Sequence, residues 1–241
     1  MKTRFGYIRI LATLAFIAVV IGQIALPVRS VNAETVLRLG HIFSPADPTH
    51  QGAERFAQQV EKYSEGRVKI KIFPAGQLGN NRKLFGLVRS GGIDISTTPY
   101  PMLADAVPEY NIYTAGYMYN GWEDLKKVLD HPDYGQAWNK RLLEKSGLRV
   151  LANYFFGART LTTTNTLVTK PSDLEGLKIR AVPNEMSLAV VTGLGGTPTP
   201  VPFPELFQGL RQGVADGQEN PVPTIWAQKF YEVQDYLILT R

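Results

Sequence analysis

The residue of this chain best suited to chemistry is an arginine in its second half. Arg180 ends a short strand pattern, directly before a bend at Pro183 and a predicted helix N-terminus at Asn184. A guanidinium presents a planar fork of donors that matches a carboxylate, and the amides of a helix N-terminus add partial positive charge. This placement predicts that Arg180 binds an organic anion. The alternative is a surface arginine that pairs with a local carboxylate.

Two further polar residues could assist such an arginine. Arg159 follows Phe156-Gly157-Ala158, and small residues let a ligand or a backbone approach closely. Asn220 ends the polar run 216–220, which predicts a turn because Pro221 follows it, and its amide offers both a donor and an acceptor. The alternative for Asn220 is a structural role, since asparagine before proline is a common turn residue.

The elements that must position these residues alternate between strand and helix. Period-2 patterns predict strands, and amphipathic patterns with Asn caps and Gly stops predict helices. The predicted strands cover 34–40, 67–73, 93–96, 148–154, 159–165 and 177–180. The predicted helices cover 49–64, 80–90, 185–194, 204–213 and 123–145, the last with an interruption at His131-Pro132. The proline-rich run 197–202 predicts an extended segment outside a sheet centre. This order predicts an α/β fold with mixed, mostly parallel sheets.

The first 33 residues have the pattern of a secretory signal peptide. A basic start with Lys2, Arg4 and Arg9 precedes an apolar run, 10–26, and Val31-Asn32-Ala33 offers small residues for cleavage between Ala33 and Glu34. This pattern predicts a periplasmic protein. The alternative is an uncleaved membrane anchor, because the apolar run is nearly long enough to span a bilayer. The absence of cysteine suits an oxidising compartment.

Composition narrows the possible function classes. Four of the 26 basic residues and none of the 21 acidic ones lie in the first 33 positions, so the remainder carries 22 basic and 21 acidic residues. The balance gives no reason to expect a nucleic-acid partner. The three histidines lack metal-ligand spacing, and no nucleophile motif, phosphate loop or dinucleotide fingerprint is present. We therefore expect a binding protein without metal or cofactor, and not an enzyme.

Several motifs resemble one known family. They are DLEGLKIR at 173–180, PTPVPF at 198–203, and DGQENP at 216–221 followed by QKFYEVQ at 228–234. In this respect the chain resembles the extracytoplasmic solute-binding subunit of tripartite ATP-independent periplasmic (TRAP) transporters, the DctP family. The resemblance covers nearly everything after residue 34.

The resemblance implies a fold, a function and a set of site residues. The fold is a two-domain periplasmic binding protein of type II-like architecture, with a ligand cleft between domain I (34–156) and domain II (157–241). The function is capture of an organic acid and its delivery to a TRAP membrane permease, by a monomer. Family members hold the acid through residues at the positions of Arg180, Arg159 and Asn220. Phe203 matches a ring that packs on the ligand in some relatives, with core packing as its alternative.

Two further expectations follow from the resemblance. In the family the chain continues after the strand at 235–239 and returns to domain I, so this sequence is expected to lack a C-terminal part. A periplasmic protein that presents its bound acid to a sensory receptor is the alternative function. An enzyme on a similar scaffold is a third, for which no catalytic constellation is present.

Overall fold

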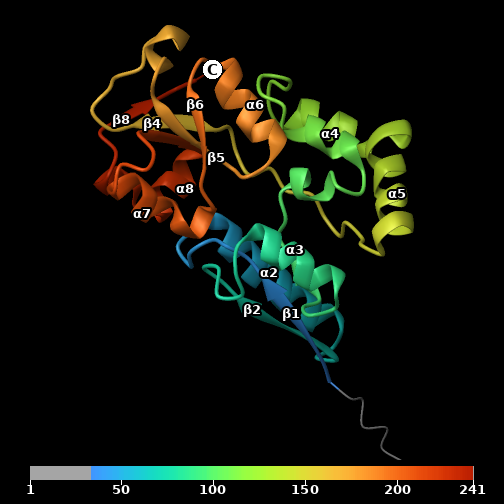
Figure 1. The fold of residues 1–241 in the computed structure, drawn as a ribbon. Coiled ribbons are helices and arrows are strands. Elements are labelled where there is room, and N and C mark those ends of the chain that lie inside the picture. The colour runs from blue at the N-terminus through green and yellow to red at the C-terminus, as the bar shows by residue number, and fades with distance from the viewer. Residues whose placement is uncertain (1–33, 241) are drawn as a thin grey trace, which may run out of the picture. The chain divides into compact units, whose positions relative to one another are not determined.

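The first half of the chain builds a small parallel sheet. The computed structural model describes residues 34–240. Strand β1 (Thr35–Gly40) lies between β2 (Val68–Phe73) and β3 (Ile95–Ser96), and both neighbours run parallel to it. Parallel strands need helical crossovers, and α2 (Pro48–Tyr63) and α3 (Asn81–Arg89) supply them (Figure 1). The three strands and two helices predicted here are confirmed.

Side-chain caps fix where these two helices begin. The Asp47 carboxylate accepts a hydrogen bond from the backbone N–H of Thr49 at 2.8 Å, and the Asn80 side chain accepts one from Lys83 at 3.1 Å. Each cap satisfies a donor that the first helical turn leaves unpaired. The predicted cap at Asn80 is confirmed.

The middle of the chain packs around an aromatic cluster. This middle part of the chain comprises 3₁₀ turns at Tyr100–Leu103 and Pro108–Thr114, helix α4 (Trp122–Asp130), a π-helical turn at Pro132–Gln136 and helix α5 (Ala137–Ser146). Tyr110 and Tyr113 are buried against Trp138, with the Tyr113 and Trp138 rings 5.3 Å apart. These tyrosines are therefore core residues of this part of the fold.

The second half builds a mixed five-stranded sheet. Its order is β6 (Thr197–Pro200), β5 (Lys178–Ala181), β7 (Gly217–Asn220), β4 (Thr160–Thr163) and β8 (Tyr236–Ile238). β5 runs parallel to β6 and β7, whereas β4 runs antiparallel to β7 and β8. Prolines cannot donate to a central ladder, which explains why the proline-rich β6 occupies an edge. The predicted α/β class with mixed, mostly parallel sheets is confirmed.

Helices cover this sheet on both sides (Figure 1). Helix α6 (Glu185–Gly193), capped by Asn184, packs through Val191 on a core with Leu161 and Ile179. Helices α7 (Leu206–Arg211) and α8 (Val222–Ala227) belong to a different core, which also contains residues of the first half such as Phe43. This core therefore joins helices and loops from both halves of the chain.

Two predictions about local structure are wrong. The segment 148–154 is not a strand; it has no sheet partner and is largely exposed, although Asn153 accepts a hydrogen bond from Tyr100. The polar run 216–220 is not a turn, because Gly217–Asn220 forms the central strand β7. Polar side chains can occupy a sheet centre when partners satisfy them, and Gln218 and Asn220 have such partners.

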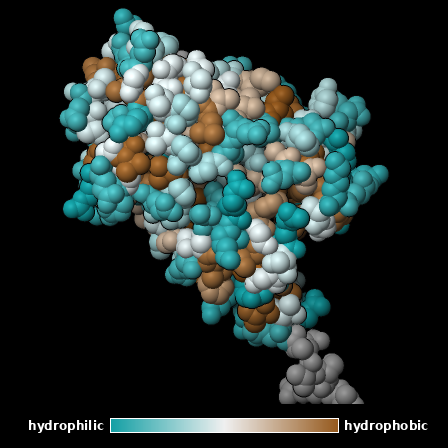
Figure 2. All heavy atoms as spheres, viewed as in Figure 1, coloured by the Kyte–Doolittle hydropathy of each residue, from teal (hydrophilic) through white to brown (hydrophobic). Residues whose placement is uncertain are grey.

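The face seen in Figure 2 is mostly polar, with apolar side chains between the polar ones. Among residues 34–240, no helix combines the length and apolar character needed to cross a bilayer. The predicted signal peptide and its cleavage site at Ala33 lie outside the described residues. The division into domains at residue 156 stays a prediction.

Candidate anion site around Arg180

Arg180 is a buried cation with an incomplete set of partners. It lies on β5, next to Ile179, and only 1% of its surface is exposed. Its Nε donates to the backbone carbonyl of Val201 at 2.8 Å. Its Nη1 is buried and has no hydrogen-bond partner among the described residues. A buried guanidinium that lacks a carboxylate of its own is costly, so this position calls for an anion.

The electrostatic surroundings of Arg180 support this conclusion. Burial lowers the pKa of its guanidinium to about 10, and the positive charge of Arg159 acts in the same direction. Glu219 partly offsets both effects by raising the pKa. The group stays charged at neutral pH, and the negative charge of an incoming carboxylate would offset the cost of burying it.

Arg159 lies near Arg180 but already has an acidic partner. Its Nε and Nη2 contact the two carboxylate oxygens of Glu219, and Nη2 also donates to the Glu219 carbonyl at 2.7 Å. The same Nη2 lies 3.2 Å from Oδ1 of Asn220. The structure thus brings Arg159 and Asn220 into direct contact. Glu219 neutralises Arg159 locally, which leaves Arg180 as the less compensated cation.

Asn220 is a central residue of the five-stranded sheet. It lies on β7 opposite Thr160 of β4 and is 2% exposed. Its Oδ1 accepts from Arg159, while its Nδ2 donates to Oε1 of Gln218. The strand, and not a turn, therefore sets the direction of this amide.

Phe203 contacts both the cation and the core. The Arg180 guanidinium carbon lies 5.9 Å from the centroid of the Phe203 ring, within the range of a cation–π interaction. The ring is 9% exposed and packs against Phe43 at 5.4 Å and Phe230 at 6.2 Å between centroids. Core packing and a place beside the anion site are both compatible with this position.

Sequence reasoning did not identify three groups that shape this site. The carbonyl of Val201 orients Arg180, Glu219 neutralises Arg159, and Gln218 binds Asn220. Glu219 and Gln218 lie within the DGQENP motif, so the motif itself was the available signal. The partner of Glu219, Arg159, is 60 positions away in the sequence, which no local pattern reveals.

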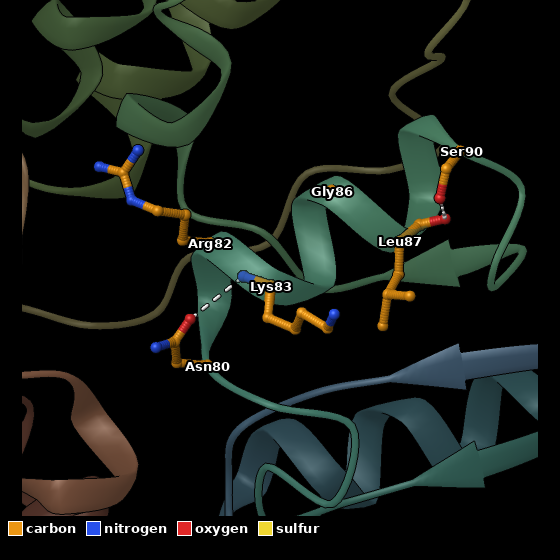
Figure 3. Close-up of a pocket in the computed structure, with 6 residues that line it drawn as sticks. All are labelled: Asn80, Arg82, Lys83, Gly86, Leu87 and Ser90. Atoms are coloured by element: carbon orange, nitrogen blue, oxygen red, sulfur yellow. Dashed lines mark hydrogen bonds between the residues drawn. The ribbon is translucent and has the colours of Figure 1, made fainter.

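A surface hollow of about 470 Å³ lies elsewhere, over α3. It is lined by Asn80, Arg82, Lys83, Gly86, Leu87 and Ser90. Figure 3 shows the Arg82 and Lys83 side chains pointing in different directions. The cationic groups do not converge on one point, so this hollow lacks the geometry of an anion site. The buried guanidinium of Arg180 is the better-supported candidate.

Two of the three histidines form a buried pair in the first half of the chain. His41 Nε2 lies 3.1 Å from His50 Nδ1, and His50 Nε2 lies 3.2 Å from the Glu54 carboxylate. Burial and the neighbouring His50 lower the pKa of His41 to about 4. Within residues 34–240, no group of three or more acidic, histidine or cysteine side chains is arranged to hold a metal ion.

Comparison with protein families gives one match that covers most of the chain. Residues 39–241 match the family model DctP, described as bacterial extracellular solute-binding protein, family 7. This match includes every residue of the candidate site.

Curated relatives and solved structures agree with that match. An uncharacterized protein from Haemophilus influenzae is 36% identical over 86% of this chain, which covers 63% of that relative. The 2,3-diketo-L-gulonate-binding periplasmic protein YiaO from Escherichia coli is 33% identical over 95% of this chain and 69% of its own length. The chain thus spans about two thirds of the length of these two relatives.

A solved structure shows the fold. The sugar acid binding protein DctPAm from Advenella mimigardefordensis, in complex with galactonate, is 34% identical to this chain. Its TM-score is 0.80, with coverage of 85% of this chain and 66% of that one.

Proposed function

Because this chain belongs to family 7 of the bacterial extracellular solute-binding proteins, the DctP family, we propose that it captures an organic acid and delivers it to a TRAP membrane permease. The family is one of binding proteins, and the prediction that the chain is a binder and not an enzyme is confirmed. The proposed compartment is the periplasm, where family relatives such as YiaO are located by name.

The observation that carries the ligand proposal is the unpartnered Nη1 of Arg180. Nearly all of the Arg180 side chain is buried. Glu219, the acidic residue whose charge acts on Arg180, is itself hydrogen-bonded to Arg159. A ligand carboxylate could accept a charge-assisted hydrogen bond from Nη1 and balance the buried charge. Arg159, Asn220 and Phe203 are proposed to complete the site around the same ligand.

The proposed ligand class is sugar acids, ahead of simple dicarboxylates. DctPAm was solved with galactonate, and YiaO is named for 2,3-diketo-L-gulonate; both ligands carry one carboxylate and several oxygens. The amide of Asn220 and the carboxylate of Glu219 could bind hydroxyl groups beside a carboxylate held by Arg180.

A thermal-shift comparison of galactonate with galactitol tests the proposal. The two compounds share a six-carbon polyol skeleton, but only galactonate has a carboxylate. Galactonate at about 100 times its Kd should stabilise the chain by about 2.7 kcal/mol, and galactitol should not. Thermal shifts with 2,3-diketo-L-gulonate and succinate compare a second sugar acid with a simple dicarboxylate. Stabilisation by neutral polyols alone would contradict the carboxylate proposal.

The transport role has a separate test. Deleting neighbouring genes that encode large and small membrane permease subunits should abolish uptake of the acid that binds. A chain whose gene neighbours only a sensor kinase, with uptake unchanged by its deletion, would favour the sensing alternative.

A further inference from the structure

A continuous line of amides and hydroxyls starts at Asn220 on β7 and runs past β4 to the loop before β8. Asn220 Nδ2 donates to Gln218 Oε1, and Gln218 Nε2 donates to Thr162 Oγ1 at 2.7 Å. Thr162 Oγ1 lies 3.0 Å from Gln234 Oε1, and Gln234 Nε2 donates to Thr164. Asn220, Gln218, Thr162 and Gln234 are each less than 10% exposed. We call this line the amide relay.

The two ends of the amide relay determine its direction. At one end, Arg159 has only donors, so Asn220 must turn its oxygen toward Arg159. At the other end, the Thr164 hydroxyl donates to the backbone carbonyl of Val233 at 3.1 Å, and a carbonyl can only accept. Between a donor-only group and an acceptor-only group, each member donates to the next one. Only one orientation of each amide satisfies all of these bonds.

The strand register explains why these residues meet. Thr162 of β4 is the direct partner of Gln218 on β7, and Thr160 is the partner of Asn220. Side chains alternate along a strand, so Gln218 and Asn220 lie on one face of β7. Gly217 pairs with Ile179 of β5, so Gln218, one position later, is next to Arg180 in the parallel register. The amide relay therefore runs directly beside the candidate anion site.

We propose that Gln218 is a positioning residue for anion binding, with Thr162 and Gln234 as its support. This inference rests on the proposed function. Gln218 accepts one Nδ2 hydrogen of Asn220 and so keeps the Asn220 oxygen on Arg159. The second Nδ2 hydrogen is then a donor for an acid. With the amide reversed, the Asn220 oxygen would face the oxygen of Gln218 and would repel a carboxylate. The amide relay thereby presents a donor, and not an acceptor, to the ligand.

Three variants of the whole chain test this role. Gln218→Met keeps the length of the side chain but removes the acceptor for Asn220. Thr162→Val removes the next hydroxyl without changing the shape of the side chain. Thr163→Val is the matched control, because Thr163 is equally buried on the same strand but bonds to the Thr166 carbonyl outside the amide relay.

The first readout needs no ligand. The side-chain NH₂ signals of Asn220, assigned by their loss in Asn220→Asp, are followed by hydrogen exchange in NMR spectra. Exchange should be at least about tenfold faster in Gln218→Met, because one hydrogen bond contributes on that scale, and about twofold or more faster in Thr162→Val. Thr163→Val should leave it unchanged. Equal exchange in all variants would overturn the amide relay.

The second readout is galactonate affinity by calorimetry. Kd should rise about 10-fold in Gln218→Met and about 2- to 5-fold in Thr162→Val, and stay constant in Thr163→Val. Faster exchange at Asn220 with unchanged affinity would overturn the positioning role. If the unaltered chain does not bind galactonate or the other acids, the proposed function fails. Hydrogen exchange of the Asn220 NH₂ group then still decides whether the amide relay orients the Asn220 side chain.

Discussion

Replacing Arg180 with methionine should stabilise the ligand-free protein while it removes acid binding. Methionine keeps an apolar stem against Phe203 but removes the buried charge. The pKa of Arg180 is lowered to about 10, and one pKa unit corresponds to about 1.4 kcal/mol, so burial disfavours the folded, charged form by about 3 kcal/mol. The variant also leaves the Val201 carbonyl without its donor, which costs about 1–2 kcal/mol. The net expectation is a gain of about 1–2 kcal/mol in the free energy of unfolding.

The assay combines thermal unfolding with calorimetric titration of galactonate. For a chain of this length, the stability gain corresponds to a rise in Tm of about 2–8 °C without ligand. Loss of a charge-assisted pair should weaken galactonate binding by at least about tenfold. Arg180→Lys is the matched variant, because it keeps the charge but loses the planar fork, and its affinity should also fall about tenfold with little change in Tm. A destabilised Arg180→Met protein with normal affinity would refute the reasoning.

Three further predictions concern residues other than Arg180. Because the pKa of His41 is about 4 in the folded state, below its unfolded value, the free energy of unfolding should fall as pH drops from 6.5 toward 4, by about 2 kcal/mol at pH 5. His41→Asn, which retains an acceptor for the Phe43 N–H, should flatten this dependence in denaturant titrations at pH 7.5 and 5; an identical slope would exclude His41. Arg159→Ala should raise the Kd for galactonate about tenfold in calorimetry, since it removes a cation beside Arg180; an unchanged Kd would place Arg159 outside the site. Gly217→Ala should lower the free energy of unfolding by about 3 kcal/mol, because its Cβ would lie 2.5 Å from the Thr162 carbonyl oxygen; a neutral effect in chemical denaturation would mean that β4 and β7 can separate freely.

Local patterns predicted most helices and strands because the signals are themselves local. Period-2 alternation marks β1 and β2, and Asn80 and Asn184 mark the starts of α3 and α6. The segment 148–154 shows the limit of this approach: alternation favours an extended backbone, but a strand also needs a neighbour, which the sequence pattern does not contain.

The sequence suggested which residues form the candidate site, but not how they are buried or which residues they contact. Arg180 is the clearest example, since a cationic residue on an alternating strand is usually solvated, whereas here it is buried beneath Phe203. The polar strand β7 was read as a turn because single residues such as Asn220 favour turns when no partner is known. The residues of β4 that pair with β7 lie about 60 positions earlier in the sequence. This antiparallel pairing exists only in the folded sheet.

The central claim is that Arg180 binds the carboxylate of an organic acid, and a crystal structure of the protein with galactonate tests it most directly. The account predicts a carboxylate oxygen about 2.7–2.9 Å from Nη1 of Arg180, with Asn220 donating to the same ligand. A galactonate whose carboxylate lies away from Arg180, with Nη1 still unpartnered, would contradict the claim.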